Sequence, residues 1–450
     1  MVISDNSRRD FIKKAVTGTA ALSLASVLPA FSAKSYSSII GSNERINVGV
    51  MGVNGRGRAL AKNFASQSNC EVTFISDVDS RATEKCMASL AEIQKRKPKA
   101  EPDFRKALES KNMDALVVAT PDHWHAPAAI LASKAGKHVY LEKPCSHNPN
   151  EGELLIAAVN KYNNVIQMGN QRRSWSKIIE AIDQLKSGVI GRPYFAKGWY
   201  TNNRGSMGIG KVVAVPAWLD YELWQGPAPR MPYKDNVIHY NWHWIWNWGT
   251  GEALNNGTHM VDLMRWGLGV EYPTRVTSAG GRYRYQDDWE TPDTQVITLE
   301  FPNKTSMTWE GRSCNGRTIE GTGAGVMFYG ETGSMLLDGE NSYKIYDLKN
   351  NVVKEVASET VVDGHDLRDP SQALDAIHIQ NFFNAINKGA RLNADIVGGH
   401  QSTLLCQLGN IALRSGGVLN IDPSNGHIIG NAEAQKLWGR AYEPGWEPKV

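Results

Sequence analysis

The residues that suggest chemistry begin directly after a short apolar run. Gly52-Val53-Asn54-Gly55-Arg56-Gly57 follows the β-branched, apolar stretch 45–51 and precedes a helical pattern over 59–65. Small residues in such a turn let the backbone approach a pyrophosphate, and the helix N-terminus adds free N–H groups and a positive dipole end. Asn54 replaces the middle glycine of G-x-G-x-x-G, and Asn tolerates left-handed backbone angles. We therefore predict dinucleotide contacts from Gly52, Asn54, Gly55, Arg56 and Gly57.

Asp77 stands where a carboxylate accepts hydrogen bonds from the adenosine ribose hydroxyls. It ends a second apolar run, 71–75, and lies 20 residues after Gly57. A carboxylate there favours NAD over NADP, because a 2′-phosphate would face it, although Arg81 leaves NADP open. We prefer this role to the alternative that Asp77 caps the helix that opens near Asp79.

Polar groups also follow two later apolar runs. Thr120-Pro121-Asp122-His123-Trp124-His125 comes after 114–119, and Glu142-Lys143-Pro144 comes after 138–141. Parallel strands bring their carboxyl ends to one edge of a sheet, where α/β proteins bind ligands. Both runs are therefore expected beside the same crevice, and a shared site explains them better than packing does.

The elements that position these groups alternate between strand and helix. The apolar runs that read as strands cover 45–51, 71–75, 114–119 and 138–141. Helical patterns over 59–65 and 127–135 accompany them. This alternation predicts an α/β fold over residues 44–166, namely a Rossmann domain with a doubly wound parallel sheet.

Beyond residue 167 the alternation gives way to a second domain. Its longer, antiparallel-looking segments are 194–201, 275–285, 294–301 and 306–310. We predict an α+β domain over 167–420, with helices over 373–386 and 398–414 and an extended tail over 421–450. Asn170 and Arg173 lie at the crossover between the domains, where cofactor and substrate should meet, and are predicted substrate contacts.

The segment 241–248 (NWHWIWNW) places four tryptophans at alternate positions: Trp242, Trp244, Trp246 and Trp248. In an extended chain all four would lie on one face. Such a face suits either a buried core or an aromatic surface for sugar rings, and both alternatives stay open. Trp244 and His243 are candidate substrate contacts, with His239 as a further one. No carboxylate or cysteine completes a metal-binding spacing with these histidines, so no metal is expected.

Composition excludes several classes of protein. The 450 residues include 49 Lys plus Arg against 46 Asp plus Glu, which gives a formal net charge of +3. No long charged block occurs, so the extensive phosphate contact of nucleic-acid binding is not indicated. Five scattered cysteines are too few for a disulfide framework or a zinc cluster.

Residues 1–34 read as an export signal. Arg8 and Arg9 form a twin-arginine pair, and an uncharged stretch of small and apolar residues follows over 15–33. The apolar centre is too short and too rich in Ala and Ser for a membrane span, so no stable membrane insertion is expected after its removal. This signal predicts a periplasmic location. The twin-arginine route carries proteins that are already folded, often with a cofactor inside. Free nicotinamide nucleotide should be scarce in the periplasm, so the cofactor is expected to be held tightly.

These motifs together resemble those of the Gfo/Idh/MocA family. The family pattern A-T-P-N-x-x-H is matched by residues 119–125, with Asp122 in the Asn position, and E-K-P is matched in full by Glu142-Lys143-Pro144. The resemblance covers roughly residues 44–420. It implies a second domain with a large, open, mostly antiparallel sheet, and pairing of such sheets into a homodimer or homotetramer. It also implies cofactor contacts from Thr120, Pro121, His125, Glu142 and Lys143.

The family's third motif, L-D-x-G-x-H, reads Leu254-Asn255-Asn256-Gly257-Thr258-His259 in this chain. The resemblance implies that Lys143, His259 and the residue at the Asp position are catalytic and line the substrate hydroxyl beside the nicotinamide. Asn255 occupies that position, and an amide cannot take up a proton, which puts a relay through it in question. His259 titrates near working pH and suits a general base, whereas Lys143 orients the oxygen or acts as the base itself.

The resemblance predicts an exported NAD(P)-dependent oxidoreductase that transfers a hydride between a sugar or polyol hydroxyl and the nicotinamide. One alternative is a redox-neutral glycoside hydrolase with tightly bound NAD, which oxidises one carbon, eliminates a neighbouring group and returns the hydride. A second alternative is a non-catalytic sugar- or nucleotide-binding protein. Asn255 in place of Asp favours that alternative, while Lys143 and His259 argue against it.

Overall fold

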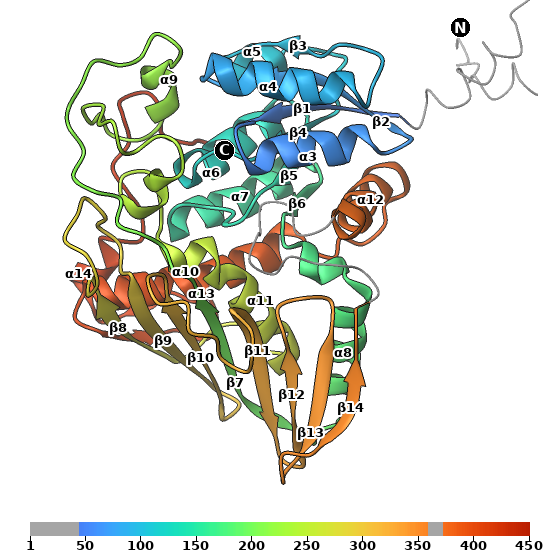
Figure 1. Ribbon diagram of the computed structural model, residues 1–450, viewed down its shortest axis with the longest axis vertical. Helices are drawn as coiled ribbons and strands as arrows, with labels where there is room; N and C mark the ends of the chain where they lie inside the picture. Colours follow the sequence, from blue (N-terminus) through green and yellow to red (C-terminus); the bar gives the residue numbers. More distant parts are fainter. Residues whose placement is uncertain (1–44, 359–371) are drawn as a thin grey trace, which may run out of the picture. The chain divides into compact units, whose positions relative to one another are not determined.

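The structure is a computed structural model and describes residues 45–358 and 372–450 (Figure 1). Its first part contains a six-stranded parallel sheet with the order β3-β2-β1-β4-β5-β6. The strands are β1 (Ile46–Met51), β2 (Cys70–Ser76), β3 (Lys99–Ala100), β4 (Ala115–Val118), β5 (His138–Leu141) and β6 (Ile166–Met168). This order is that of a doubly wound dinucleotide-binding sheet, so the predicted Rossmann fold is confirmed.

Helices connect these strands. They are α3 (Arg56–Ala65), α4 (Ser80–Ala91), α5 (Phe104–Leu108), α6 (Asp122–Lys134) and α7 (Pro149–Tyr162). β1 and β4 are buried along nearly their whole length, as strands covered by helices on both faces are. Unbroken apolar runs could therefore identify them in the sequence. β6 continues the parallel sheet to Met168, past the expected boundary at residue 166.

The second sheet has ten strands in the order β14-β13-β12-β11-β7-β10-β9-β8-β15-β16. They are β7 (Pro193–Thr201), β8 (Arg275–Gly281), β9 (Thr294–Phe301), β10 (Thr305–Arg312), β11 (Ala324–Gly330), β12 (Gly333–Leu337), β13 (Tyr343–Asp347), β14 (Val352–Val356), β15 (Val418–Ile421) and β16 (Ile428–Ile429). Neighbouring strands are antiparallel except β7 and β10, which run parallel. The predicted open, mostly antiparallel sheet is confirmed.

Helices α8 (Ser176–Lys186), α11 (Gly257–Leu268) and α13 (Ile396–Arg414) cover one face of this sheet (Figure 1). Because these helices cover one face, the residues of β10 alternate between buried and half-buried along the strand. Its inward-facing Met307 and Trp309 join the largest apolar core. The short elements of this part are α9 (Tyr221–Gln225), η2 (Asn241–Trp244), α10 (Glu252–Asn255) and α14 (Ala432–Gln435).

Two C-terminal segments return to the Rossmann part. α12 (Gln372–Lys388) buries Phe382 and Phe383 against Phe64 of α3, in agreement with the helix expected over 373–386. The segment expected to be an extended tail contains β16, and its end packs on α6. There Trp446 meets Trp124 edge-on at a centroid distance of 5.2 Å. The last residues therefore pack against this chain's own core.

The four alternating tryptophans of 241–248 do not lie on one extended face. Asn241–Trp244 forms a short 3-10 helix, and the next residues continue as a turn. Trp244 is 1% exposed and stacks on Trp289 at 4.0 Å, whereas Trp248 packs edge-on against Trp224. The alternating tryptophans thus serve separate packing contacts, and a period of two does not by itself make a strand.

The expected export signal, residues 1–34, lies outside the described residues. Among the residues that are described, no helix combines the length and the apolar character needed to cross a bilayer. All five cysteines are free thiols. Over 45–358 and 372–450, no three His, Cys, Asp or Glu side chains gather in a way that could hold a metal ion.

Candidate active site

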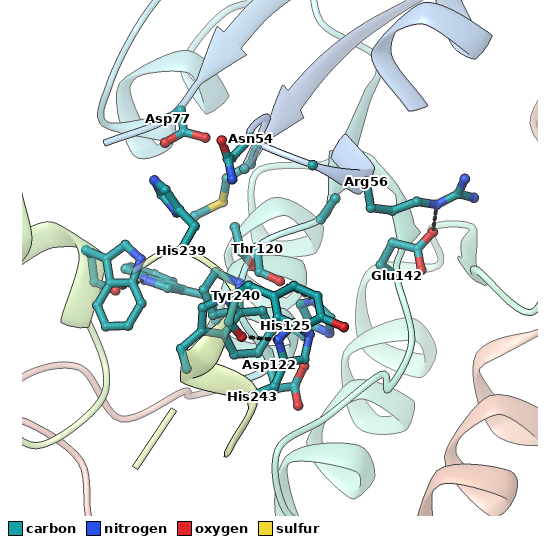
Figure 2. Close-up of a pocket in the computed structure, with 18 of the residues that line it drawn as sticks. Asn54, Arg56, Asp77, Thr120, Asp122, His125, Glu142, His239, Tyr240 and His243 are labelled. Atoms are coloured by element: carbon teal, nitrogen blue, oxygen red, sulfur yellow. Dashed lines mark hydrogen bonds and ion pairs between the residues drawn. The ribbon is translucent and has the colours of Figure 1, made fainter. Parts of the chain in front are cut away.

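A cavity of about 750 Å³ lies where the strands of the parallel sheet end (Figure 2). One wall comes from the turns after β1, β2, β4 and β5. The other comes from residues 200–204, from parts of the segment 223–243, and from α10 with the residue after it. Doubly wound sheets bind their ligands in this crevice, and the volume is typical of a cofactor or small-molecule site.

All the predicted cofactor residues except Gly57 line this cavity. They are Gly52, Asn54, Gly55, Arg56, Asp77, Thr120, Pro121, His125, Glu142 and Lys143. Figure 2 shows Asn54 and Asp77 towards the top of the view, with Asp122, His125 and His243 below them. The motifs read from the sequence therefore converge on one site, as the strand-end argument requires.

The glycine turn is closely packed at Gly52 and Gly57 but open at Gly55. Gly52 has a φ of +80°, and a Cβ there would lie 2.8 Å from the carbonyl oxygen of Ala119. A Cβ on Gly57 would overlap the carbonyl oxygen of Gly52 at 1.7 Å. A Cβ on Gly55, by contrast, would meet no atom within 4 Å. The turn is thus tight on its inner side and open at the start of α3, where an anion can approach the helix N-terminus.

Asp77 lies at the end of β2 and faces the cavity. Its carboxylate accepts hydrogen bonds from the backbone N–H groups of Val53 at 2.6 Å and Asp79 at 2.9 Å. Burial raises the pKa of Asp77, and these two bonds oppose the shift. The residue that caps α4 is Asp79, which accepts the N–H of Arg81 at 2.8 Å. The helix-cap role considered for Asp77 therefore belongs to its neighbour.

The Arg81 side chain is bonded to groups other than a ribose. Its guanidinium donates to both carboxylate oxygens of Asp79, at 3.1 and 2.8 Å. It also lies 3.3 Å from the centroid of a Trp218 ring. The cation that left NADP open in the sequence thus has two partners of its own.

A segment of the second domain is bonded to the turn after β2. The N–H of Ser80 donates to the carbonyl oxygen of Trp218, and the N–H of Asp220 donates to that of Val78, both at 3.0 Å. Val78 also lines the cavity. The rim of the cavity at this end is therefore held by backbone hydrogen bonds between the two domains.

Arg56 in the glycine turn is held by two buried carboxylates. Its Nε donates to Glu142 at 2.8 Å, a bond drawn in Figure 2, and its Nη atoms donate to Asp375 at 2.7 and 3.1 Å. Burial opposes the charge of Arg56, but Asp375 and Glu142 outweigh it, and the pKa of the guanidinium is raised. Asp375 belongs to α12, 319 residues further along the chain. No local sequence signal pairs these two residues.

Lys143 and Asn255 meet at the cavity wall. Lys143 Nζ donates to the backbone carbonyl oxygen of Asn255 at 2.7 Å and to its side-chain Oδ1 at 3.3 Å. The Asn255 amide nitrogen donates to Glu252 at 3.3 Å, which fixes the direction of the amide. Burial lowers the pKa of Lys143, while Glu142 and Asp122 act in the opposite direction. A lysine whose pKa is lowered towards neutrality is suited to proton transfer.

His259 is not among the residues that line the cavity. Its side chain lies in α11 and is 2% exposed, and its buried Nδ1 has no hydrogen-bond partner among the described residues. Burial lowers the pKa of His259 well below its usual value, and the charges of Arg172 and Lys143 lower it further. The structure therefore brings together two of the three predicted catalytic residues and leaves the third in the core.

Of the five predicted substrate contacts, His243 and His239 line the cavity. Trp244 is in the core, and Asn170 is 2% exposed in the turn after β6. Arg173 forms a bidentate ion pair with Asp262 of α11 at 2.7 and 2.8 Å and lies over Trp266. Its guanidinium is bound to α11, which explains why a position at the domain crossover does not bring it to the cavity.

Several cavity residues were missed in the sequence. Asn202 and Arg204 follow β7 of the mostly antiparallel sheet, so the strand-end argument, which holds for parallel strands, did not extend to them. Arg204 donates to Glu252 at 3.0 Å and to the Tyr240 hydroxyl at 2.5 Å. Tyr240 comes from an irregular segment with a φ of +88°, for which the sequence offers no comparable signal.

The Rossmann end of the cavity fits a dinucleotide. Within residues 45–358 and 372–450, Gly55 faces open space at the N-terminus of α3, and the buried Thr120 Oγ1 has no hydrogen-bond partner. Each oxygen of Asp77 accepts one bond from the backbone, and a carboxylate oxygen can accept a second. These groups provide what a pyrophosphate and a ribose require at such a turn.

The sheet order, the glycine turn and the strand-end lysine define a dinucleotide-binding α/β protein with a site between two domains. Comparison with known families agrees. Residues 46–170 match the "Oxidoreductase family, NAD-binding Rossmann fold", and residues 178–336 match the "GFO/IDH/MocA C-terminal domain". The two matches together cover more than half of the chain. The chain belongs to the Gfo/Idh/MocA family of oxidoreductases and has its NAD-binding domain.

Curated relatives include two kinds of enzyme. An inositol 2-dehydrogenase from Rubrobacter xylanophilus is 29% identical over 165 residues, which is 36% of this chain and 46% of the relative. A glycosyl hydrolase family 109 protein from Saccharopolyspora erythraea is 26% identical over 182 residues, which is 39% of each protein. The matched part of this chain thus spans less than half the length of these relatives.

Solved structures share the fold over a longer stretch. Levoglucosan dehydrogenase in complex with NADH and levoglucosan has a TM-score of 0.64 at 17% identity, covering 84% of this chain and 99% of that one. The WlbA dehydrogenase from Bordetella pertussis, in complex with NADH and UDP-GlcNAcA, has a TM-score of 0.63 at 18% identity with the same coverage. At these identities the likeness shows the fold.

Proposed function

We propose that this protein is an NAD-dependent oxidoreductase that transfers a hydride between the nicotinamide and a hydroxyl-bearing carbon of a sugar or polyol. The observation that carries the proposal is the position of Lys143. It stands on the cavity wall at the end of β5, with Nζ 2.7 Å from the Asn255 carbonyl oxygen of the second domain. Family membership and the dehydrogenases among the relatives support this proposal.

The glycine turn, Thr120 and Asp77 would hold NAD, which when bound supplies the hydride acceptor or donor. Asp77 favours NAD over NADP, because its carboxylate repels a 2′-phosphate. Arg81, the nearby cation, is paired with Asp79 and packed on Trp218. Its charge is therefore already balanced, which strengthens the preference for NAD.

Lys143 orients the substrate oxygen. An ammonium group has three donors, and the two hydrogen bonds to Asn255 leave one for a ligand in the cavity. A positive charge at this point stabilises the negative charge that develops on the oxygen as the hydride leaves. Glu252 accepts a hydrogen bond from the Asn255 amide and holds it in place. The amide in turn fixes the position of the Lys143 ammonium.

The opposite wall suits a saccharide. Tyr200, Tyr240 and Trp242 provide aromatic surface, and Asn202 and His243 provide hydrogen-bonding groups. Ligand sites of this kind combine apolar surface with a few polar groups that fix orientation. A sugar offers both, since its ring has C–H faces and a rim of hydroxyls.

Turnover of a panel of sugars and polyols, followed by NADH absorbance, tests the proposal. Lys143→Ala should lower kcat at least about a hundredfold, the scale for losing one positioned donor that stabilises the developing negative charge on the oxygen. Lys436→Ala, at an exposed ion pair, is the matched control and should not change turnover. A Lys143→Ala enzyme within tenfold of the wild type would refute the assignment of the site.

A redox-neutral glycoside hydrolase is the second candidate. The similarity to glycosyl hydrolase family 109 proteins favours it. In this reaction the hydride taken from one carbon is returned after a neighbouring group has been eliminated, so no net NADH forms. Glycoside cleavage without NADH release would select this candidate, whereas net NADH formation on a simple polyol would exclude it.

We also propose that residues 1–34 direct the folded chain to the periplasm with its cofactor. The exported form, purified without added nucleotide and then denatured, should release about one NAD(H) per chain, measured by mass spectrometry. Replacing Arg8 and Arg9 by lysine should retain the protein in the cytoplasm. An exported protein without nucleotide would contradict the proposal that the cofactor is carried through export.

Light scattering would test the homodimer or homotetramer that the open sheet suggests.

A further inference from the structure

The cavity wall near Lys143 contains a carboxylate without a direct cationic partner. Asp122 begins α6 immediately beyond β4, lines the cavity and is 3% exposed. Its Oδ2 accepts a hydrogen bond from Thr250 Oγ1 at 2.5 Å. Within the described residues it forms no ion pair, although the charges of His125 and Lys143 reach it. A buried carboxylate in this setting is available for proton transfer.

The other titratable groups of the Rossmann wall have fixed partners. Glu142 is paired with Arg56, and Asp77 accepts two backbone N–H groups. Both ring nitrogens of His125 face backbone carbonyl oxygens, at 2.6 and 2.9 Å. Both ring nitrogens are thus directed at backbone carbonyl oxygens, and neither is turned towards a ligand in the cavity.

The carboxylate and the histidines that the second domain contributes near the cavity are also unsuited to accept the substrate proton. Glu252 accepts hydrogen bonds from Asn255, Asn256, Arg204 and Ser313. His239 contacts the carboxylate of Asp79 at 2.8 Å. Burial lowers the pKa of His243 to about 3, which makes it a weak base at neutral pH, and His259 is not on the wall.

Two departures from the family motifs point to the same carboxylate. Asn255 stands where the third motif has Asp, and Asp122 stands where the first motif has Asn. Both side chains line one cavity. Compared with the family motifs, this chain has an amide in α10 and a carboxylate after β4. A carboxylate therefore remains in this part of the cavity, at a different position.

We propose that Asp122 receives the proton of the substrate hydroxyl, a part that Asn255 cannot play. The inference rests on the proposed function. As the carbon gives up its hydride to the nicotinamide, the O–H bond breaks, a C=O bond forms, and the Asp122 carboxylate becomes a carboxylic acid. Lys143 remains an ammonium and stabilises the oxygen.

The charges around Asp122 suit this role. Burial raises its pKa, while His125, the Thr250 hydrogen bond and Lys143 oppose the rise. Lys143 in turn faces Glu142 and Glu252, and the nearby His243 stays neutral at working pH because burial depresses its pKa. A carboxylate whose pKa is raised towards neutrality accepts a proton more readily than an exposed one.

Asp122→Asn in the NAD-loaded enzyme is the first test. It keeps the shape of the side chain and should lower kcat at least about a hundredfold, with NAD affinity within twofold of the wild type. The acidic limb of the kcat–pH profile should disappear. Thr250→Val keeps the carboxylate but removes a bond that lowers its pKa, so the limb should persist and move to higher pH. The double variant Asp122→Asn/Asn255→Asp should recover at least tenfold of the lost kcat.

A second readout needs no turnover. Because the charge of Asp122 raises the pKa of Lys143, Asp122→Asn should lower the pH midpoint for acetylation of Lys143, measured by mass spectrometry. A variant that keeps kcat within twofold and retains its acidic limb would overturn the proposal, as would an unchanged midpoint. Failure of the proposed function would look different: the wild type would be inert on every sugar and polyol while the midpoint still shifted.

Discussion

Removing the carboxylate of Asp375 should destabilise the dinucleotide turn from the far side of the Rossmann sheet. The Asp375 side chain is fully buried, and Arg56 is 13% exposed. Arg56 donates to both Asp375 oxygens, at 2.7 and 3.1 Å, and Asn63 adds a bond at 2.9 Å. Asp375→Ala would take one carboxylate away from a buried guanidinium, while Glu142 stays paired with it.

The expected loss follows from the burial of this pair. Removing one partner of a buried ion pair costs about 3–5 kcal/mol, because the other charge stays out of water without compensation. Glu142 still neutralises part of the charge, so we expect the lower end, about 3 kcal/mol. An unfolding entropy of about 2 cal/mol/K per residue makes 1 kcal/mol worth about 1 °C in a chain of this length. The Tm should therefore fall by about 3 °C.

Thermal unfolding followed by circular dichroism measures this effect. Asp375→Asn keeps the volume and one acceptor, so it should fall between the wild type and Asp375→Ala. The matched control is Glu433→Ala, which breaks an exposed pair with Lys436 and should change the free energy of unfolding by less than about 1 kcal/mol. If Asp375→Ala and Glu433→Ala unfolded at the same temperature, the argument for a buried charge cluster would fail.

Three further predictions concern specificity and pH. Asp77→Ser should raise the ratio of kcat/KM with NADP to that with NAD at least about tenfold, since no carboxylate would repel the 2′-phosphate; an unchanged ratio would count against the ribose assignment. Burial lowers the pKa of His378 to about 4, against about 6.5 in an unfolded chain, so the unfolded state binds the proton first as the pH falls. The free energy of unfolding should thus decrease from about pH 6.5 to about pH 4, and His378→Gln should flatten that slope; equal slopes in urea titrations would contradict this. Trp242→Ala should raise KM for the sugar about tenfold and change kcat less than threefold, and a loss confined to kcat would show that the ring is not a binding surface.

The Rossmann half was predictable because its strands are buried on both faces. β1 and β4 read as unbroken apolar runs, and the polar groups after them had to share one edge of the sheet. The same logic placed Lys143 correctly at the cavity. It does not extend to Asn202 and Arg204, because these residues follow β7 in the mostly antiparallel sheet of the second domain.

The contacts that could not be predicted join distant parts of the chain. Nothing near Arg56 in the sequence indicates Asp375, because the pair depends on how α12 docks against α3. His259 sits in a recognisable motif, but motif membership does not report burial, and its side chain is 2% exposed. The stacking of Trp244 on Trp289 could not be predicted for a related reason, since Trp289 lies in another segment.

The backbone bonds at the cavity rim also make a built-in reporter of opening. The N–H groups of Ser80 and Asp220 donate in opposite directions between the turn after β2 and the segment that covers it. Any widening of the cavity at this edge must break both bonds, so hydrogen–deuterium exchange at these two amides follows local opening directly. Their protection factors, with and without nucleotide, would give the free energy that separates the closed rim from an open one in the resting protein.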